Sequence, residues 1–113
     1  MEVYIRLGPE FNKQFKRLMK KYRSLKNDFK LFSQDLRRHP QQGDPLGASL
    51  YKVRMAIASK GKGKRGGARV ITYHVLATQE RIEITLLTIY DKNEMDNVSD
   101  DYLRALVKDI SGQ

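Results

Sequence analysis

The stretch of residues 60–69 constrains the fold of this chain more than any other. It reads KGKGKRGGAR and places five basic residues and four glycines in ten positions. Glycine destabilises a helix and charged side chains are kept out of a core, so the stretch must be a loop in water. Apolar and polar residues alternate before it (SLYKVRMAIA) and after it (ARVITYHVLA), which is typical of β-strands. The sequence therefore predicts a long β-hairpin with a basic, glycine-rich tip.

Positive charge is concentrated in this hairpin. Seven basic side chains and no acidic one lie between Lys52 and Arg69, and the whole chain has a formal charge of +9 and a pI of about 9.9. Such a field attracts polyanions. Nucleic acid is the first candidate partner and an acidic protein the second.

Composition also limits the class of protein. The 113 residues suffice for one core, so we expect a single domain over residues 1–113. No apolar run approaches the roughly 20 residues of a membrane helix, and no signal arrangement is present at the N-terminus. We therefore expect a soluble, cytoplasmic protein without membrane contact. No cysteine and two histidines argue against a metal centre, and we expect no cofactor.

The rest of the chain predicts helices before the hairpin and one after it. A strand is expected at residues 2–7, a basic amphipathic helix from Pro9, and a second helix capped by Ser24 that ends before His39. Residues 39–48 (HPQQGDPLGA) are expected to be a loop. A covered strand follows at residues 82–90, and Ser99 can cap a last helix.

The order β-α-α-β-β-β-α predicts an α+β fold. We expect a mostly antiparallel sheet with the two N-terminal helices packed on one face, together with a C-terminal helix. The opposite face is then left for function.

Cations on the strand before the loop are candidates for chemistry. Lys52 and Arg54 share the solvent face of that strand about 7 Å apart, a spacing that suits neighbouring phosphate oxygens. Arg69 opens the returning strand, and its guanidinium can reach the same surface and bind a phosphate. An ordinary solvated strand face is the alternative interpretation.

The end of the covered strand supplies further candidates. Lys92 and Asn93 follow it, where side chains leave the core. Tyr90 can stack on a base or supply a hydroxyl, or belong to the core. Asp91, Glu94 and Asp96 are interpreted as a solvated turn, because one loop offers few convergent metal ligands.

Two motifs resemble the RelE/HigB-type toxins of bacterial type II toxin-antitoxin systems. They are YKVRMAIASKGKGKRGGARVITY and LLTIYDKNE, and the loop is similar to that of the HigB branch. The resemblance covers nearly the whole chain. It implies a RelE-like fold and a ribosome-dependent mRNA endonuclease that cleaves the message in the ribosomal A site and is neutralised by a cognate antitoxin. The implied partners are thus the antitoxin, the ribosome and mRNA.

The resemblance also assigns roles. Lys52 and Arg54 match the basic pair before the loop, and Arg69 matches the phosphate-binding arginine after it. A lysine crowded by cations gives up its proton more readily, so Lys52 or Lys92 is a candidate base. This chain has Asn93 and Ser99 where RelE has a second arginine and a catalytic tyrosine, which leaves the general acid open. The remaining RNA-binding candidates are Lys60, Lys62, Lys64, Arg65, Asn93 and Tyr90, the first four forming a mobile clamp.

Two other functions fit the same fold. One is a basic module that binds RNA or DNA without cleaving it, which the charge supports equally well. The other is a ParE-like gyrase poison, against which the cations Lys52, Arg54 and Arg69 argue.

Overall fold

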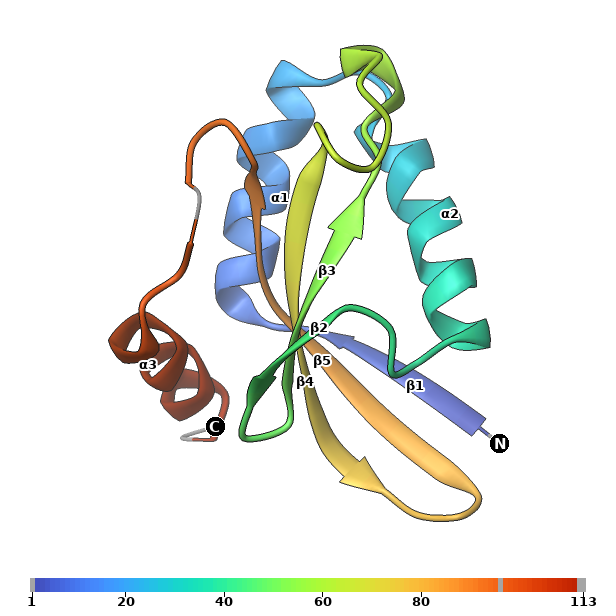
Figure 1. Ribbon diagram of the computed structural model, residues 1–113, viewed down its shortest axis with the longest axis vertical. Coiled ribbons are helices and arrows are strands. Elements are labelled where there is room, and N and C mark those ends of the chain that lie inside the picture. The colour runs from blue at the N-terminus through green and yellow to red at the C-terminus, as the bar shows by residue number, and fades with distance from the viewer. Residues whose placement is uncertain (1, 96, 112–113) are drawn as a thin grey trace.

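A five-stranded sheet organises the chain (Figure 1). The computed structural model describes residues 2–95 and 97–111. The sheet order is β1-β5-β4-β3-β2, in which only β1 and β5 run parallel. The strands are β1 (Glu2–Leu7), β2 (Asp44–Gly47), β3 (Leu50–Met55), β4 (Ala68–Ala77) and β5 (Arg81–Asp91). The predicted mostly antiparallel α+β fold is confirmed.

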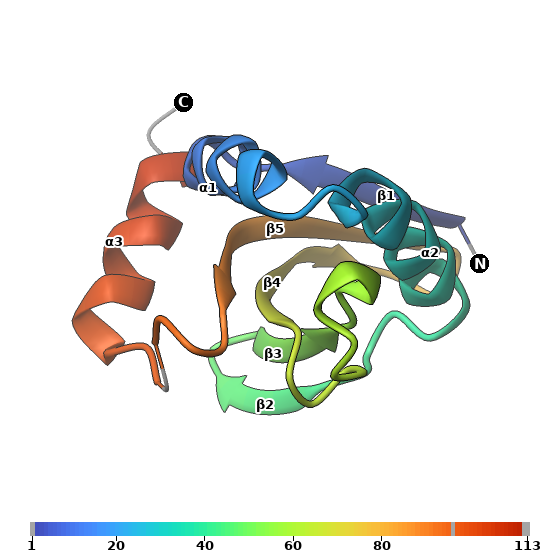
Figure 2. The same ribbon diagram turned by 90° about the horizontal axis from the view of Figure 1, so that it is seen from above.

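Helices α1 (Pro9–Lys21) and α2 (Leu25–Arg38) cover one face of the sheet, as Figure 2 shows. Their apolar stripes recur every three or four residues, so each helix has one side that must be buried. Phe11 and Leu18 of α1 and Leu36 of α2 are at most 1% exposed, and they pack in one cluster with Val53 and Ile84 of the sheet. Burial against the sheet stabilises both helices, as predicted.

Helix α3 (Asp100–Ser111) packs on the opposite face. It begins as expected at Ser99, whose hydroxyl accepts a hydrogen bond of 3.0 Å from the amide of Tyr102. Leu103 and Leu106 form a second cluster with sheet residues that include Ile71 and Tyr90. The expectation that this whole face is free for function is therefore wrong, because α3 covers part of it. Within the described residues, no helix combines the length and apolar character that crossing a bilayer takes.

Strand β2 was not predicted from the sequence, which favoured a loop over residues 39–48. Its residues pair with β3, where Asp44 lies opposite Lys52 and Pro45 opposite Tyr51. Proline lacks an amide hydrogen, but it is tolerated at the edge of a sheet, where one side of the strand needs no partner. Pairing with β3 thus outweighs the poor strand propensity of this segment.

The connection between β3 and β4 is more ordered than a simple hairpin tip. The first strand ends at Met55 rather than at residue 58, and the 3₁₀ turn η1 (Ala58–Lys60) follows it. At the far end, Gly67 lies so close to the preceding strand that an added Cβ would be 2.1 Å from the Met55 carbonyl oxygen. Glycine is therefore required there by space rather than by flexibility.

Candidate nucleic-acid interface

Three cations lie next to one another on the face of the sheet that α1 and α2 do not cover. Lys52 and Arg54 alternate on β3, and Arg54 is directly opposite Arg69 of β4 in the antiparallel register. Directly opposed residues hold their Cβ atoms about 5 Å apart on the same face. Lys52 and Arg54 also line a concavity of about 340 Å³ with Asp44 and Lys64. The structure thus brings together the three hairpin cations singled out from the sequence.

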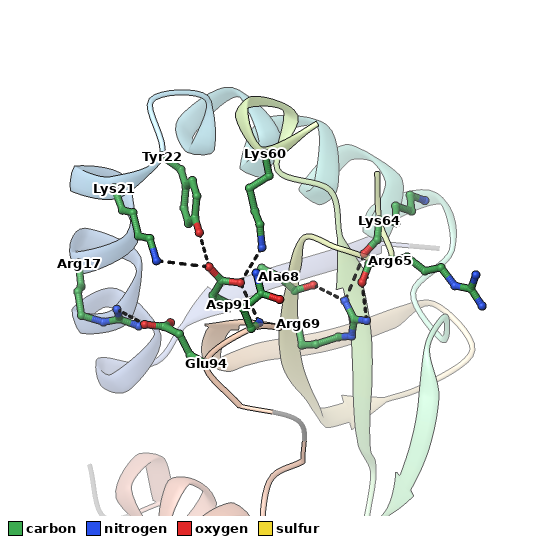
Figure 3. A network of polar contacts seen from close by, with 11 residues as sticks. Arg17, Lys21, Tyr22, Lys60, Lys64, Arg65, Ala68, Arg69, Asp91 and Glu94 are labelled. Carbon is green, nitrogen blue, oxygen red and sulfur yellow. Dashed lines mark hydrogen bonds and ion pairs between the residues drawn. The ribbon is translucent and has the colours of Figure 1, made fainter. Parts of the chain in front are cut away.

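The guanidinium of Arg69 is held in place by the loop. The residue is only 7% exposed, and its Nη1 donates to the carbonyl oxygens of Lys64 and Ala68 at 3.2 and 3.1 Å. Its Nη2 donates to the carbonyl oxygen of Arg65 at 3.0 Å (Figure 3). Burial and then the charge of Arg54 lower the pKa of Arg69, yet an arginine stays protonated in a protein at neutral pH. Since a guanidinium has five donor hydrogens, two are not used by these three bonds.

The loop itself presents its cations to solvent. Lys62, Lys64 and Arg65 are exposed. In Figure 3, Lys64 and Arg65 point away from the body of the molecule. Gly61 and Gly63 adopt positive φ angles of 69° and 61°, a left-handed conformation that glycine adopts without strain. These three side chains lie where an RNA backbone could meet them.

Lys60 differs from the other loop cations, and its predicted place in a solvent-facing clamp is wrong. Its side chain is 6% exposed and its Nζ is 2.7 Å from Oδ1 of Asp91, a carboxylate that is 0% exposed. Tyr22, which directly follows α1, donates its hydroxyl to Oδ2 of the same carboxylate, and the amide of Asn93 donates to Oδ1 at 3.0 Å. The charge of Lys60 is therefore used inside the protein (Figure 3).

Asp91 was not predicted to be a buried, paired carboxylate, and its predicted place in a solvated turn is wrong. Burial alone would raise its pKa, but the hydrogen bonds from Lys60, Tyr22 and the Asn93 amide lower it to about 2. Glu94 is on the surface, where its ion pair with Arg17 lowers its pKa. Asp96 lies outside the described residues. The one sequence signal for Asp91 is that it directly ends the long apolar strand.

The remaining candidates at the end of β5 are divided between core and surface. Tyr90 is 4% exposed and belongs to the cluster under α3, so its ring is not open for stacking on a base. Its hydroxyl is buried without a hydrogen-bond partner among the described residues, and burial raises its pKa. Lys92 and Asn93 are exposed, and the amide of Lys92 donates to the carbonyl oxygen of Gly67 at 3.1 Å. The end of β5 therefore contacts the end of the loop.

Chemically, this arrangement is suited to a phosphodiester. Fixed and exposed cations together can bind neighbouring phosphates and stabilise negative charge that develops during a reaction. The matching of the sequence to known proteins agrees with this interpretation. The family model described as "RelE toxin of RelE / RelB toxin-antitoxin system" matches residues 11–112, nearly the whole chain. This protein belongs to the RelE toxin family of toxin-antitoxin systems.

Proposed function

We propose that this toxin cleaves messenger RNA on the ribosome, as a member of the HigB-like branch, and that a cognate antitoxin neutralises it. The observation that carries the proposal is the direct opposition of the exposed Arg54 and the buried Arg69, beside Lys52, on the face of the sheet opposite to α1 and α2. A protein that only binds nucleic acid needs exposed cations, whereas Arg69 is a buried cation fixed by three hydrogen bonds. Fixed charges of this kind stabilise a transition state better than mobile ones.

The proposed reaction is attack of a ribose 2′-hydroxyl on its own phosphodiester. The hydroxyl loses its proton to a base, its oxygen bonds to phosphorus, the bond to the 5′-oxygen breaks, and that oxygen takes up a proton. Arg54 and Arg69 are assigned to the non-bridging oxygens, where negative charge grows. Lys52 or Lys92 takes the proton, and another ammonium of the cluster can supply one to the leaving oxygen.

The exposed side chains around the three cations are assigned to RNA binding. Lys62, Lys64 and Arg65 contact the phosphate backbone, and Asn93 contributes at the end of β5. Contacts to phosphate position a nucleic acid without selecting its sequence. Each of these residues should therefore be replaceable at modest cost, in contrast to Arg54 and Arg69.

The cleanest test is Arg54→Met in a cell-free translation extract. Arg69 also holds loop carbonyls, so its replacement disturbs the loop as well as the charge, whereas Arg54 is exposed. We expect the wild-type protein to cleave the message during translation. The cleavage rate of Arg54→Met should be lower by a factor of about 100 or more. The new 5′ ends should carry hydroxyl groups, which must be phosphorylated by a kinase before they can be ligated and sequenced.

Arg104→Met on α3 is the matched control. It removes the same charge from a side chain that is 74% exposed and forms a surface ion pair with Asp101. Its cleavage rate should equal that of wild type. An intact message with wild-type protein would exclude the nuclease, and retained binding to RNA would then favour the non-enzymatic module. Equal cleavage by Arg54→Met and wild type would place the reaction elsewhere.

A further inference from the structure

The base of the loop is held by side chains from α2 and from Ser24, the residue that precedes it. Asp28 of α2 is 6% exposed, and its two carboxylate oxygens accept from the amide of Ala58 at 3.2 and 3.1 Å. The hydroxyl of Ser24 donates to Asp28 at 2.7 Å and accepts from the amide of Ser59 at 2.9 Å. The 3₁₀ turn η1 is thus bonded to the helices just before the loop begins.

The ion pair with Asp91 fixes Lys60, the residue that follows Ser59 and directly precedes the glycine-rich part of the loop. The carboxylate joins three parts of the fold: Asp91 ends β5, and its oxygens accept hydrogen bonds from the Lys60 ammonium of η1 and from the hydroxyl of Tyr22, which directly follows α1. Lys21 adds a more distant cation at 3.9 Å on the exposed side. A fully buried carboxylate costs free energy unless it is paired and hydrogen-bonded. Here both of its oxygens have partners, so the pairing is built into the fold.

The other end of the loop is fixed by Arg69. Its guanidinium donates hydrogen bonds to the carbonyl oxygens of Lys64 and Arg65. The backbone amide of Lys92 donates to the carbonyl oxygen of Gly67. Asp91 also lies opposite Ala68 in the pairing of β4 with β5. Asp91 therefore holds both ends of the loop. Its side chain binds Lys60 at the first end, and its backbone pairs with Ala68 at the second end.

We propose that Asp91 is the positioning residue of the RNA-cleavage site. By holding Lys60, it fixes residues 61–67, and the carbonyl oxygens of Lys64 and Arg65 in this loop hold the guanidinium of Arg69 in place. The proposal deepens the proposed nuclease function and rests on it. Asp91 itself is not in contact with RNA, because its carboxylate is covered by Lys60 and Tyr22.

The kinetic test compares Asp91→Asn with wild type in ribosome-bound message cleavage. We expect kcat to fall about 10- to 100-fold, because small misplacements of catalytic groups have effects of that size. KM should change less than about 3-fold, since the exposed cations that supply RNA affinity remain. Lys60→Met should behave in the same way. The double variant should be no slower than the slower single variant, because both changes break one contact.

Glu94→Gln is the matched control for Asp91→Asn. It converts a carboxylate to an amide three residues away, on a side chain that is 36% exposed and paired with Arg17 at the surface. Its kcat should equal that of wild type. Circular dichroism and a thermal melt establish that each variant is folded. If Asp91→Asn does not fold, Lys60→Met tests the same contact on the surviving carboxylate.

A proteolysis experiment tests the positioning without using the activity. Trypsin must accommodate the lysine side chain that precedes the bond it cuts, and the Lys60 side chain is only 6% exposed. Cleavage after Lys60 should therefore be slow in wild type and about 10-fold faster in Asp91→Asn, relative to cleavage after the exposed Lys62 in the same sample. Mass spectrometry of the fragments gives both rates.

The two experiments separate the two proposals. If wild type does not cleave message but cleavage after Lys60 rises in Asp91→Asn, the loop is positioned as described and the nuclease function is wrong. If folded Asp91→Asn retains the wild-type kcat, or if the trypsin ratio does not change, Asp91 is not the positioning residue.

Discussion

Replacing Asp91 by Asn should make the stability of this protein less sensitive to acid. The carboxylate is 0% exposed, and its pKa lies at about 2 against an ordinary value of 3.8. A carboxyl group whose pKa is lower in the folded state stabilises the fold above its unfolded pKa and loses that contribution as the pH falls toward the folded pKa. At 1.36 kcal/mol per pKa unit, the difference of 3.8 minus 2 amounts to about 2.4 kcal/mol at neutral pH.

Urea unfolding of wild type and Asp91→Asn at pH 6 and pH 3 measures this contribution. The gap in unfolding free energy between them should shrink by about 1.1 kcal/mol at pH 3, where roughly half of the contribution remains. The two proteins share every other acidic group, so the change in the gap isolates Asp91. Glu94→Gln should show a change below about 0.5 kcal/mol, because exposed ion pairs contribute little. A gap that is equal at both pH values, or wider at pH 3, would refute the reasoning.

Two further predictions concern packing. Gly67→Ala should lower the unfolding free energy in a urea titration by roughly 1–3 kcal/mol, since its Cβ would be 2.1 Å from the backbone oxygen of Met55; an unchanged unfolding free energy would contradict this close approach. Leu103→Ala should lower the unfolding free energy by roughly 2–5 kcal/mol, because it removes packing between α3 and the sheet. Val75→Ala, at a side chain that is 51% exposed, should lower it by less than about 0.5 kcal/mol. Equal thermal melts for these two variants would contradict the assignment of Leu103 to a core.

The sequence predicts the helices and long strands well because each has a clear apolar period. Phe11 and Leu18 mark the buried side of α1, and Val53 and Met55 mark the buried face of β3, all in one cluster as expected. Strand β2 was missed because its stability comes from pairing with β3 at the sheet edge. Local composition around Pro45 carries no sign of that partner.

The arrangement of the candidate site was predictable only where residue type and strand alternation decide which face a side chain is on. The alternation of Lys52 and Arg54 fixes their face, and the register then places Arg69 beside them. Lys60 looks identical to Lys62 in the sequence. The difference between them is the buried carboxylate of Asp91, which lies 31 positions away in the chain. A pairing of that kind depends on the fold, so a single sequence cannot reveal it.

The place of β5 in the sheet has a consequence for synthesis. This strand lies between β1 and β4, and its pairing joins Glu2 to Arg81, residues that are 79 positions apart in the chain. Contacts that are so distant in sequence form slowly, because a long loop must first be closed. A nascent chain has to extend through β5 before β1 finds its neighbour and Lys60 finds its counter-ion. A toxin built in this way completes its candidate site only after the chain has been made through Asp91, the last residue of β5.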